Sequence, residues 1–226
     1  MADFQLPKFR CVPKCGYCCR ISPITIFPHE VHILKRLAEK LGVSIRIRPG
    51  YRLLDAANRV KIVTSYILEL DAEEERCPFL ADDDTCMIHS IYKPVTCRSF
   101  PRVPRVLQYV IDRERKMLYF TYEIGVSKAC PQVRKLYTDD ELKLIAENAE
   151  IAQKVMPEEY RACEEFLYIR KLYLDFLTIL WRQGVVEILD TPVDYPWPLI
   201  NAYDFIRQYF PEVTIQTFTL GKKVKL

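Results

Sequence analysis

The sequence predicts an α+β fold in which a cysteine-rich part with short antiparallel strands is followed by a mainly helical part. All but one of the nine cysteines precede residue 135, among short segments rich in β-branched and aromatic residues. Beyond residue 137 the apolar residues instead recur every three or four positions, as they do in amphipathic helices. We therefore expect a cysteine-cluster domain over residues 1–135 and a mainly helical region over residues 136–226.

Length and composition favour a soluble globular protein. Of its 226 residues, 50% are hydrophobic and 28% are charged, which allows a sizeable buried core. No apolar run approaches the ~18 residues of a membrane-spanning helix, and the first residues lack the pattern of a signal peptide. We therefore expect a cytoplasmic protein with no membrane association. In that reducing compartment, clustered cysteines indicate metal binding or redox chemistry rather than disulfides.

The cysteine-rich part contains one long predicted helix among several predicted strands. Pro28 suits the first position of a helix, and the apolar periodicity after it predicts a helix as far as Lys40, with Gly42 as its stop. Asp82–Asp84 are expected at the solvated tip of a hairpin. Strands are expected over 24–27, 43–48, 61–70, 106–112 and 117–122, the last two paired as a hairpin.

The helical region begins with a recognisable start signal. Thr138 followed by Glu141 is the pattern of a capping box, and it predicts a helix as far as about residue 155. Further along we expect a long helix, a last amphipathic helix and a terminal strand, over 157–181, 199–209 and 213–220 respectively.

The most distinctive pattern is the spacing of the cysteines. Four of them form a C-x3-C-x2-C-C motif within nine residues: Cys11, Cys15, Cys18 and Cys19. Four more stand in short local contexts later in the chain: Cys77, Cys86, Cys97 and Cys130. Thiolates are soft ligands that suit zinc, copper(I) and iron–sulfur clusters. Buried free cysteines are the alternative, which four thiols so close together disfavour.

Adjacent Cys18 and Cys19 bear on the number of metal centres. Their side chains point apart in an extended backbone, so we expect them to serve different centres rather than one tetrahedral ion. The eight cysteines could then divide four and four. Cys163 lies within a predicted helix and is expected to be an ordinary helical residue outside the site.

Two details favour an iron–sulfur cluster, of the 4Fe–4S type, over zinc. Cys77 and Cys130 are each followed by proline, as is the last cysteine of the bacterial ferredoxin motif. The C-x3-C-x2-C spacing also matches the three-cysteine loop of radical S-adenosylmethionine enzymes, which makes S-adenosylmethionine a candidate cofactor. The chain lacks the alternating strands and helices of their barrel, and no catalytic residue is evident, so whether it is an enzyme stays open.

Three further residues have physical uses beside thiolates. A cation near sulfur stabilises the thiolate form, and Lys93 and Arg98 can both supply one. Arg98 could instead bind a substrate carboxylate or phosphate, or form a structural ion pair. Tyr17 is expected to shield the site from water.

Charge is spread unevenly along the chain. Residues 1–137 hold 23 Lys and Arg against 15 Asp and Glu, a net charge of +8, whereas residues 138–226 hold 10 against 15, a net charge of −5. The basic excess can compensate thiolate charge, or it can provide a surface for nucleic acid. The candidate residues for such a surface are Arg102, Arg105, Arg113 and Arg115.

The cysteine motifs follow one another in an order that is similar to that of a known family. C-x3-C-G-x-C-C is followed by C-P-F-L, C-x-I, K-P-x2-C-R-x-F-P and C-P. This order resembles the YkgJ-type CxxxCxxCC cysteine-cluster family, over about residues 9–132. The resemblance implies a domain that chelates zinc or iron through the eight motif cysteines, in proteins often described as containing iron–sulfur clusters. One branch resembles protein methyltransferases.

Three functions follow from these patterns. The favoured one is a metal-binding protein, iron–sulfur or zinc, with a structural or electron-transfer role and an unidentified protein or redox partner. The second is a cluster-dependent modifying enzyme, such as a protein methyltransferase that uses S-adenosylmethionine. The third is a nucleic-acid-binding module stabilised by zinc.

Overall fold

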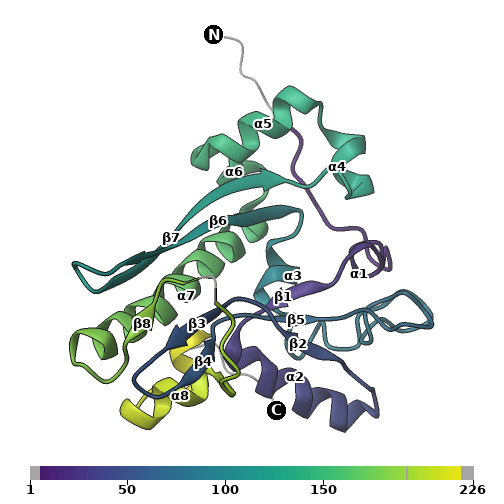
Figure 1. Cartoon of the computed structure of the whole chain (residues 1–226). Helices are drawn as coiled ribbons and strands as arrows, with labels where there is room; N and C mark the ends of the chain where they lie inside the picture. Colours follow the sequence, from purple (N-terminus) through teal and green to yellow (C-terminus); the bar gives the residue numbers. More distant parts are fainter. Residues whose placement is uncertain (1–5, 192, 220–226) are drawn as a thin grey trace.

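The computed structural model describes residues 6–191 and 193–219, and its longest element is the helix α7, which packs against α3, α6, α8, β6 and β7 (Figure 1). The helices are α1 (Cys18–Ile21), α2 (Pro28–Leu41), α3 (Val95–Ser99), α4 (Pro131–Leu136), α5 (Asp139–Glu147), α6 (Ala149–Val155), α7 (Pro157–Arg182), α8 (Ala202–Tyr209) and α9 (Ile215–Phe218). The bounds of α2 and α7 confirm the two helices predicted over 28–40 and 157–181.

The strands form three sheets in the described part of the chain. They are β1 (Ile24–Ile26), β2 (Ile47–Pro49), β3 (Arg52–Asp55), β4 (Val60–Val63), β5 (Tyr66–Leu68), β6 (Arg102–Asp112), β7 (Met117–Val126), β8 (Ile188–Leu189) and β9 (Leu199–Asn201). One sheet has the order β1-β5-β2, the second has the order β8-β3-β4-β9, and β6 and β7 form the predicted hairpin. All the pairings are antiparallel except that of β4 with β9.

The predicted strand over 61–70 is wrong in one respect, because it is divided between two sheets. The chain leaves β4 at Thr64 and enters β5 at Tyr66. The crossing is held by the backbone bond from Gly50 to the carbonyl of Ser65, at 2.8 Å. A Cβ atom at Gly50 would lie 2.7 Å from the Ser65 hydroxyl oxygen, so this close approach requires glycine. The strand predicted over 43–48 is shorter and later than expected, as β2.

Asparagine caps change the bounds of two predicted helices. Asn148 divides one of them, and Asn201 delays the start of the other. The helix expected from Thr138 to about residue 155 ends at Asn148, whose side chain accepts a hydrogen bond from the Ile151 amide and starts α6. The helix expected over 199–209 begins only at residue 202, because Asn201 caps α8 through the Tyr203 amide. An asparagine at a helix N-terminus satisfies a donor that would otherwise lack a partner, which favours the break.

The predicted terminal strand over 213–220 is also wrong for the residues that the structure describes. Thr214 and Thr217 form reciprocal capping bonds that start the short helix α9. Leu220 lies outside the described residues.

The main hydrophobic core draws side chains from both sides of residue 135. Phe166 and Tyr173 of α7 pack with Phe27 and Ile62 from the first part of the chain. Full burial of such a side chain stabilises the fold by ~1.5–3 kcal/mol. A smaller core lies among α4, α5 and α6, and another lies beside α2. The fold is α+β, as predicted, and none of the described helices has the length and apolar character needed to span a bilayer.

Candidate metal centre

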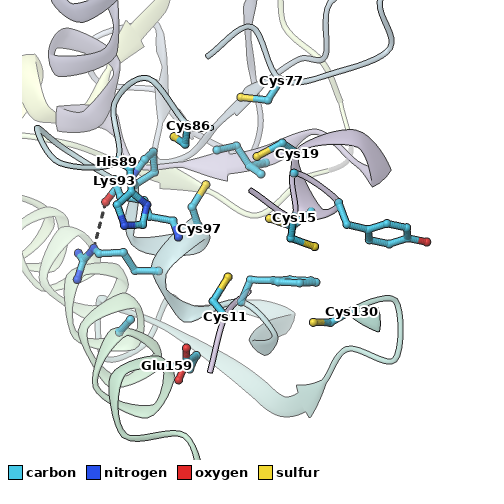
Figure 2. Close-up of a pocket in the computed structure, with 18 of the residues that line it drawn as sticks. Cys11, Cys15, Cys19, Cys77, Cys86, His89, Lys93, Cys97, Cys130 and Glu159 are labelled. Carbon is cyan, nitrogen blue, oxygen red and sulfur yellow. Dashed lines mark hydrogen bonds between the residues drawn. The ribbon is translucent and has the colours of Figure 1, made fainter. Parts of the chain in front are cut away.

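A cavity of about 1700 Å³ lies between the N-terminal loop, α3 and the first half of α7 (Figure 2). All eight cysteines singled out by their spacing line this cavity: Cys11, Cys15, Cys18, Cys19, Cys77, Cys86, Cys97 and Cys130. They come from four separate segments of the chain. Cys163 is not among the lining residues and is buried in α7.

The N-terminal loop that carries Cys11 and Cys15 is tied to the helical region. The Phe9 amide donates to the Val155 carbonyl at 2.9 Å, and the Tyr137 hydroxyl donates to the Pro7 carbonyl at 2.7 Å. The loop then turns at Gly16, where φ is +56°. A Cβ atom at Gly16 would approach the Asp84 carboxylate to 2.8 Å. Gly16 therefore allows the loop to pass close to the segment that carries the next cysteines.

Cys77 and Cys86 lie on a small hairpin-like loop beside α1. The Cys77 amide donates to the Cys19 carbonyl at 2.6 Å, and Cys86 forms an isolated antiparallel bridge with Leu80. This pairing brings two cysteines from residues 77–86 against α1, which carries Cys18 and Cys19.

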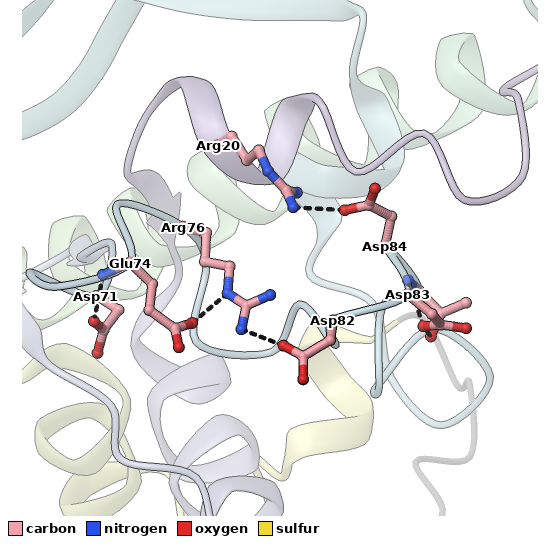
Figure 3. Close-up of polar contacts among 8 residues, drawn as sticks. Arg20, Asp71, Glu74, Arg76, Asp82, Asp83 and Asp84 are labelled. Atoms are coloured by element: carbon pink, nitrogen blue, oxygen red, sulfur yellow. Dashed lines mark hydrogen bonds and ion pairs between the residues drawn. The ribbon is translucent and has the colours of Figure 1, made fainter.

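The tip of this loop holds the three aspartates, as predicted, and each is ion-paired. Figure 3 shows the pairs of Asp82 with Arg76 and of Asp84 with Arg20. Asp83 accepts from Lys14 at 2.8 Å, and Asp84 pairs with Arg20 at 2.6 Å. Both cations belong to the segment that carries the first four cysteines. Exposed ion pairs of this kind contribute only ~0–1 kcal/mol each, so they help to align the two segments rather than hold them together.

Cys97 lies on α3, whose first turn is fixed by a buried carboxylate from α2. Glu30 accepts hydrogen bonds from the Val95 amide at 3.0 Å and from the Tyr92 hydroxyl at 2.8 Å through one oxygen. Its other oxygen accepts from the Phe27 amide at 2.8 Å. Burial raises the pKa of Glu30, and the hydrogen bonds from Phe27, Val95 and Tyr92 oppose that rise.

Arg98 connects α3 to α7. Its guanidinium donates to both carboxylate oxygens of Glu165, each at 2.7 Å, and its Nε donates to the Lys93 carbonyl at 3.0 Å. A paired guanidinium of this kind has little freedom to bind a substrate anion, so the geometry favours the structural ion pair among the roles considered for Arg98. Tyr17 lines the cavity, and its role in shielding the site from water stays a prediction.

Cys130 stands at the start of α4. Its amide donates to the Ser127 carbonyl at 3.2 Å, and Pro131 takes the first helical position, where a missing N–H group costs nothing. Pro131 is therefore explained by its place at the start of α4, as well as by the similarity of Cys130-Pro131 to the ferredoxin motif. Cys130 is 8% exposed and faces the cavity from the side opposite Cys77 and Cys86 (Figure 2).

Within the cavity the thiols fall into two groups. Cys19 interacts with Cys77 and Cys86, and Cys97 interacts with Cys19 and Cys86. Across the cavity, Cys11 interacts with Cys15 and Cys130. Cys18 connects the groups, because its thiol hydrogen-bonds to that of Cys19 and also affects the pKa of Cys11 and that of Cys97.

Burial favours the protonated form of four of these thiols. Burial raises the pKa of Cys11, Cys86, Cys97 and Cys130. The ammonium of Lys93 lowers the pKa of the first three of these thiols and so opposes part of that effect. Lys93 is therefore placed to stabilise thiolates on both sides of the cavity.

The donor set fits soft or borderline metals. Eight thiols are the ligands that zinc and iron–sulfur clusters prefer, and a lysine supplies compensating charge. Among the residues that the structure describes, no three His, Cys, Asp or Glu side chains already converge to metal-binding distance. The thiols line the cavity walls rather than meeting at one point.

Comparison with known proteins agrees with this chemistry. Residues 10–131 match the family model CxxCxxCC, described as "Putative zinc- or iron-chelating domain". The chain belongs to this CxxCxxCC family. No curated protein and no solved structure matches the chain. The CxxCxxCC match covers every cysteine of the cavity and ends before α5, so it does not include the wall that α7 provides.

The part of the cavity wall that α7 provides contains a residue that was not predicted from the sequence. Glu159 of α7 lines the cavity and is 9% exposed. A glutamate in the first turn of a helix is common, so nothing in the sequence distinguishes it. His89 also lines the cavity, whereas His29 is buried against Tyr173 and is not part of the cavity wall.

The arginines considered for a nucleic-acid surface have partners within the described chain. Arg102 is 1% exposed and donates to the carbonyls of Ile145 and Ala146, so the expectation that it is a surface residue is wrong. The other three are exposed but ion-paired: Arg105 with Glu123, Arg113 with Glu187 and Arg115 with Asp112. The geometry therefore gives no unpaired basic stripe at these positions.

Proposed function

We propose that the protein binds an iron–sulfur cluster, of the 4Fe–4S type, or zinc through the eight cavity cysteines, with a structural or electron-transfer role. The observation that carries this proposal is the convergence of all eight thiols on one cavity from four segments of the chain. Membership of the CxxCxxCC family supports zinc or iron as the metal. The bound metal would supply a Lewis-acid or one-electron centre, and Lys93 would stabilise its thiolate ligands.

The eight cysteines would hold two centres of four thiols each. One set is Cys19, Cys77, Cys86 and Cys97, and the other is Cys11, Cys15, Cys18 and Cys130. The thiols of Cys18 and Cys19 hydrogen-bond to each other in the metal-free protein and would divide between the two sets on metal binding. Cys77 and Cys86 act on Cys19, whereas Cys15 and Cys18 act on Cys130.

Anaerobic purification followed by metal and sulfide analysis tests the identity of the metal. An iron–sulfur protein is expected to be brown and to contain iron and acid-labile sulfide in equal amounts. If the protein is colourless and contains two zinc ions per chain, the metal is zinc and not an iron–sulfur cluster. A protein that takes up neither metal after reconstitution would contradict the proposal.

Paired substitutions test the division into two centres. The double variants Cys77→Ser/Cys86→Ser and Cys11→Ser/Cys130→Ser are each expected to lose about half of the bound metal, because each removes two of four ligands from one centre. Cys163→Ser is the matched control and is expected to keep the full metal content, since Cys163 lies outside the cavity. Complete metal loss in both double variants would instead indicate one shared centre.

The size of the cavity favours a second candidate, a cluster-dependent modifying enzyme that uses S-adenosylmethionine. A volume of about 1700 Å³ exceeds the ~300–1,000 Å³ of ordinary ligand pockets, which leaves space for a small molecule beside the metal. Calorimetry with reconstituted, reduced protein measures the affinity for this cofactor. Absence of binding at millimolar concentration would remove the candidate.

A further inference from the structure

The cavity contains one buried carboxylate that nothing in the proposed metal chemistry uses. Glu159 lies in the first turn of α7 and is 9% exposed. Its carboxylate accepts a hydrogen bond from its own backbone amide, and among the described residues no side chain forms an ion pair with it. Figure 2 shows it on the α7 side of the cavity, in the same view as the cysteines.

Other groups near Glu159 do not neutralise it. Burial raises the pKa of Glu159, and the hydrogen bond from its own amide and the ammonium of Lys93 oppose that rise. The same ammonium also acts on the thiols of Cys11, Cys86 and Cys97. Once those thiols bind metal as thiolates, the positive charge of Lys93 compensates them, and Glu159 has no cation of its own.

The surroundings of Glu159 increase the negative charge of this wall. Glu158 and Glu164 are exposed residues of α7 that line the same cavity. The N-terminus of α7 offsets part of a carboxylate's charge, but by less than a full counter-ion would. A buried ionised carboxylate is stable chiefly when a cation pairs with it. Glu159 lines the cavity, so a cationic group on a ligand in the cavity can reach it.

We propose that Glu159 is the recognition residue for a small ligand that brings a protonated amine into the cavity beside the cysteines. The proposal rests on the proposed metal function only in placing that ligand next to a metal centre. The ammonium would donate to the Glu159 carboxylate. A plain alkylamine and the ammonium group of an amino acid share this chemistry. They differ in whether a carboxylate is also present for Lys93 to bind.

Calorimetry on the full-length, metal-reconstituted protein tests the proposal with three probes of similar size. The probes are n-butylammonium, its neutral counterpart n-butanol, and norvaline, which adds a carboxylate to the carbon that bears the nitrogen. We expect n-butylammonium or norvaline to bind and n-butanol not to bind. Tighter binding of norvaline that is lost in Lys93→Gln identifies an amino-acid ligand, and tighter binding of n-butylammonium identifies a plain amine.

Glu159→Gln is expected to weaken binding of the amine by about 10- to 100-fold, the value of a charge-assisted hydrogen bond. Glu150→Gln is the control and is expected to change the affinity by less than about threefold, because Glu150 is an exposed residue of α6 that does not line the cavity. Equal binding by wild type and Glu159→Gln would overturn the proposal, as would the failure of both amines to bind.

Metal analysis of Glu159→Gln separates this proposal from the proposed function. The variant is expected to keep the full metal content, because Glu159 is not among the eight thiol ligands. Loss of metal from Glu159→Gln would make Glu159 a metal ligand and would overturn the amine assignment. A wild-type protein that binds the amines but no metal would contradict the proposed function alone.

Discussion

Replacing Glu30 with alanine is expected to destabilise the protein by about 3–5 kcal/mol. The substitution leaves the amides of Phe27 and Val95 and the hydroxyl of Tyr92 without an acceptor, inside a site where Glu30 is fully buried. Urea unfolding followed by circular dichroism measures the free energy of unfolding. Because Val95 begins α3, metal content should also fall as Cys97 loses its fixed position.

Glu39→Ala is the matched control for this effect. Glu39 lies on the same helix as Glu30 but is exposed, so its replacement is expected to change the free energy of unfolding by less than about 0.5 kcal/mol. Equal stability of Glu30→Ala and Glu39→Ala would show that Glu30 does not fix the start of α3.

The affinity for zinc is expected to rise by up to about 10⁴-fold per pH unit for each centre of four thiols. Zinc binds the thiolate, and below its pKa each thiol must first release a proton. Burial raises the pKa of Cys11, Cys86, Cys97 and Cys130, so the protonated form is favoured in the metal-free protein at neutral pH. Affinity therefore increases as pH rises.

Competition against a chromophoric chelator, corrected for the chelator's own protonation, measures this dependence between about pH 6 and pH 9. An ordinary cysteine has a pKa near 8.5, so its pH dependence flattens close to that value. The raised pKa values predict that the affinity keeps rising beyond it. A plateau at or below about pH 8 would show that the thiols ionise normally and that burial does not control them.

The elements with complete local signals were predicted from the sequence. For α2, Pro28 and Gly42 mark the two ends, and for α7 a long apolar periodicity follows Pro157. The breaks at Asn148 and Asn201 were missed because an asparagine is tolerated inside a helical pattern and acts as a cap only when the backbone already turns there. The division of 61–70 depends on a contact with Gly50, which no local pattern records.

The candidate site was also predicted only in part. Its cysteines were found from local sequence patterns, whereas their arrangement depends on contacts between distant residues. Eight cysteines stood out because their spacing is improbable, and all eight line one cavity. Which thiols face one another depends on the contact of Cys77 with Cys19 and on the place of Cys130 at the start of α4. Glu159 could not be recognised, because its burial at the cavity wall is a property of the folded chain.

The helix α7 gives the cavity a wall that lies outside the CxxCxxCC match. The thiols and Glu159 are therefore encoded in separate stretches of the chain. Substitutions in the first two turns of α7 can change the size, charge and selectivity of the cavity while every cysteine stays in place. Descendants of one ancestral thiol framework could diverge in what they accept by changing this single helix.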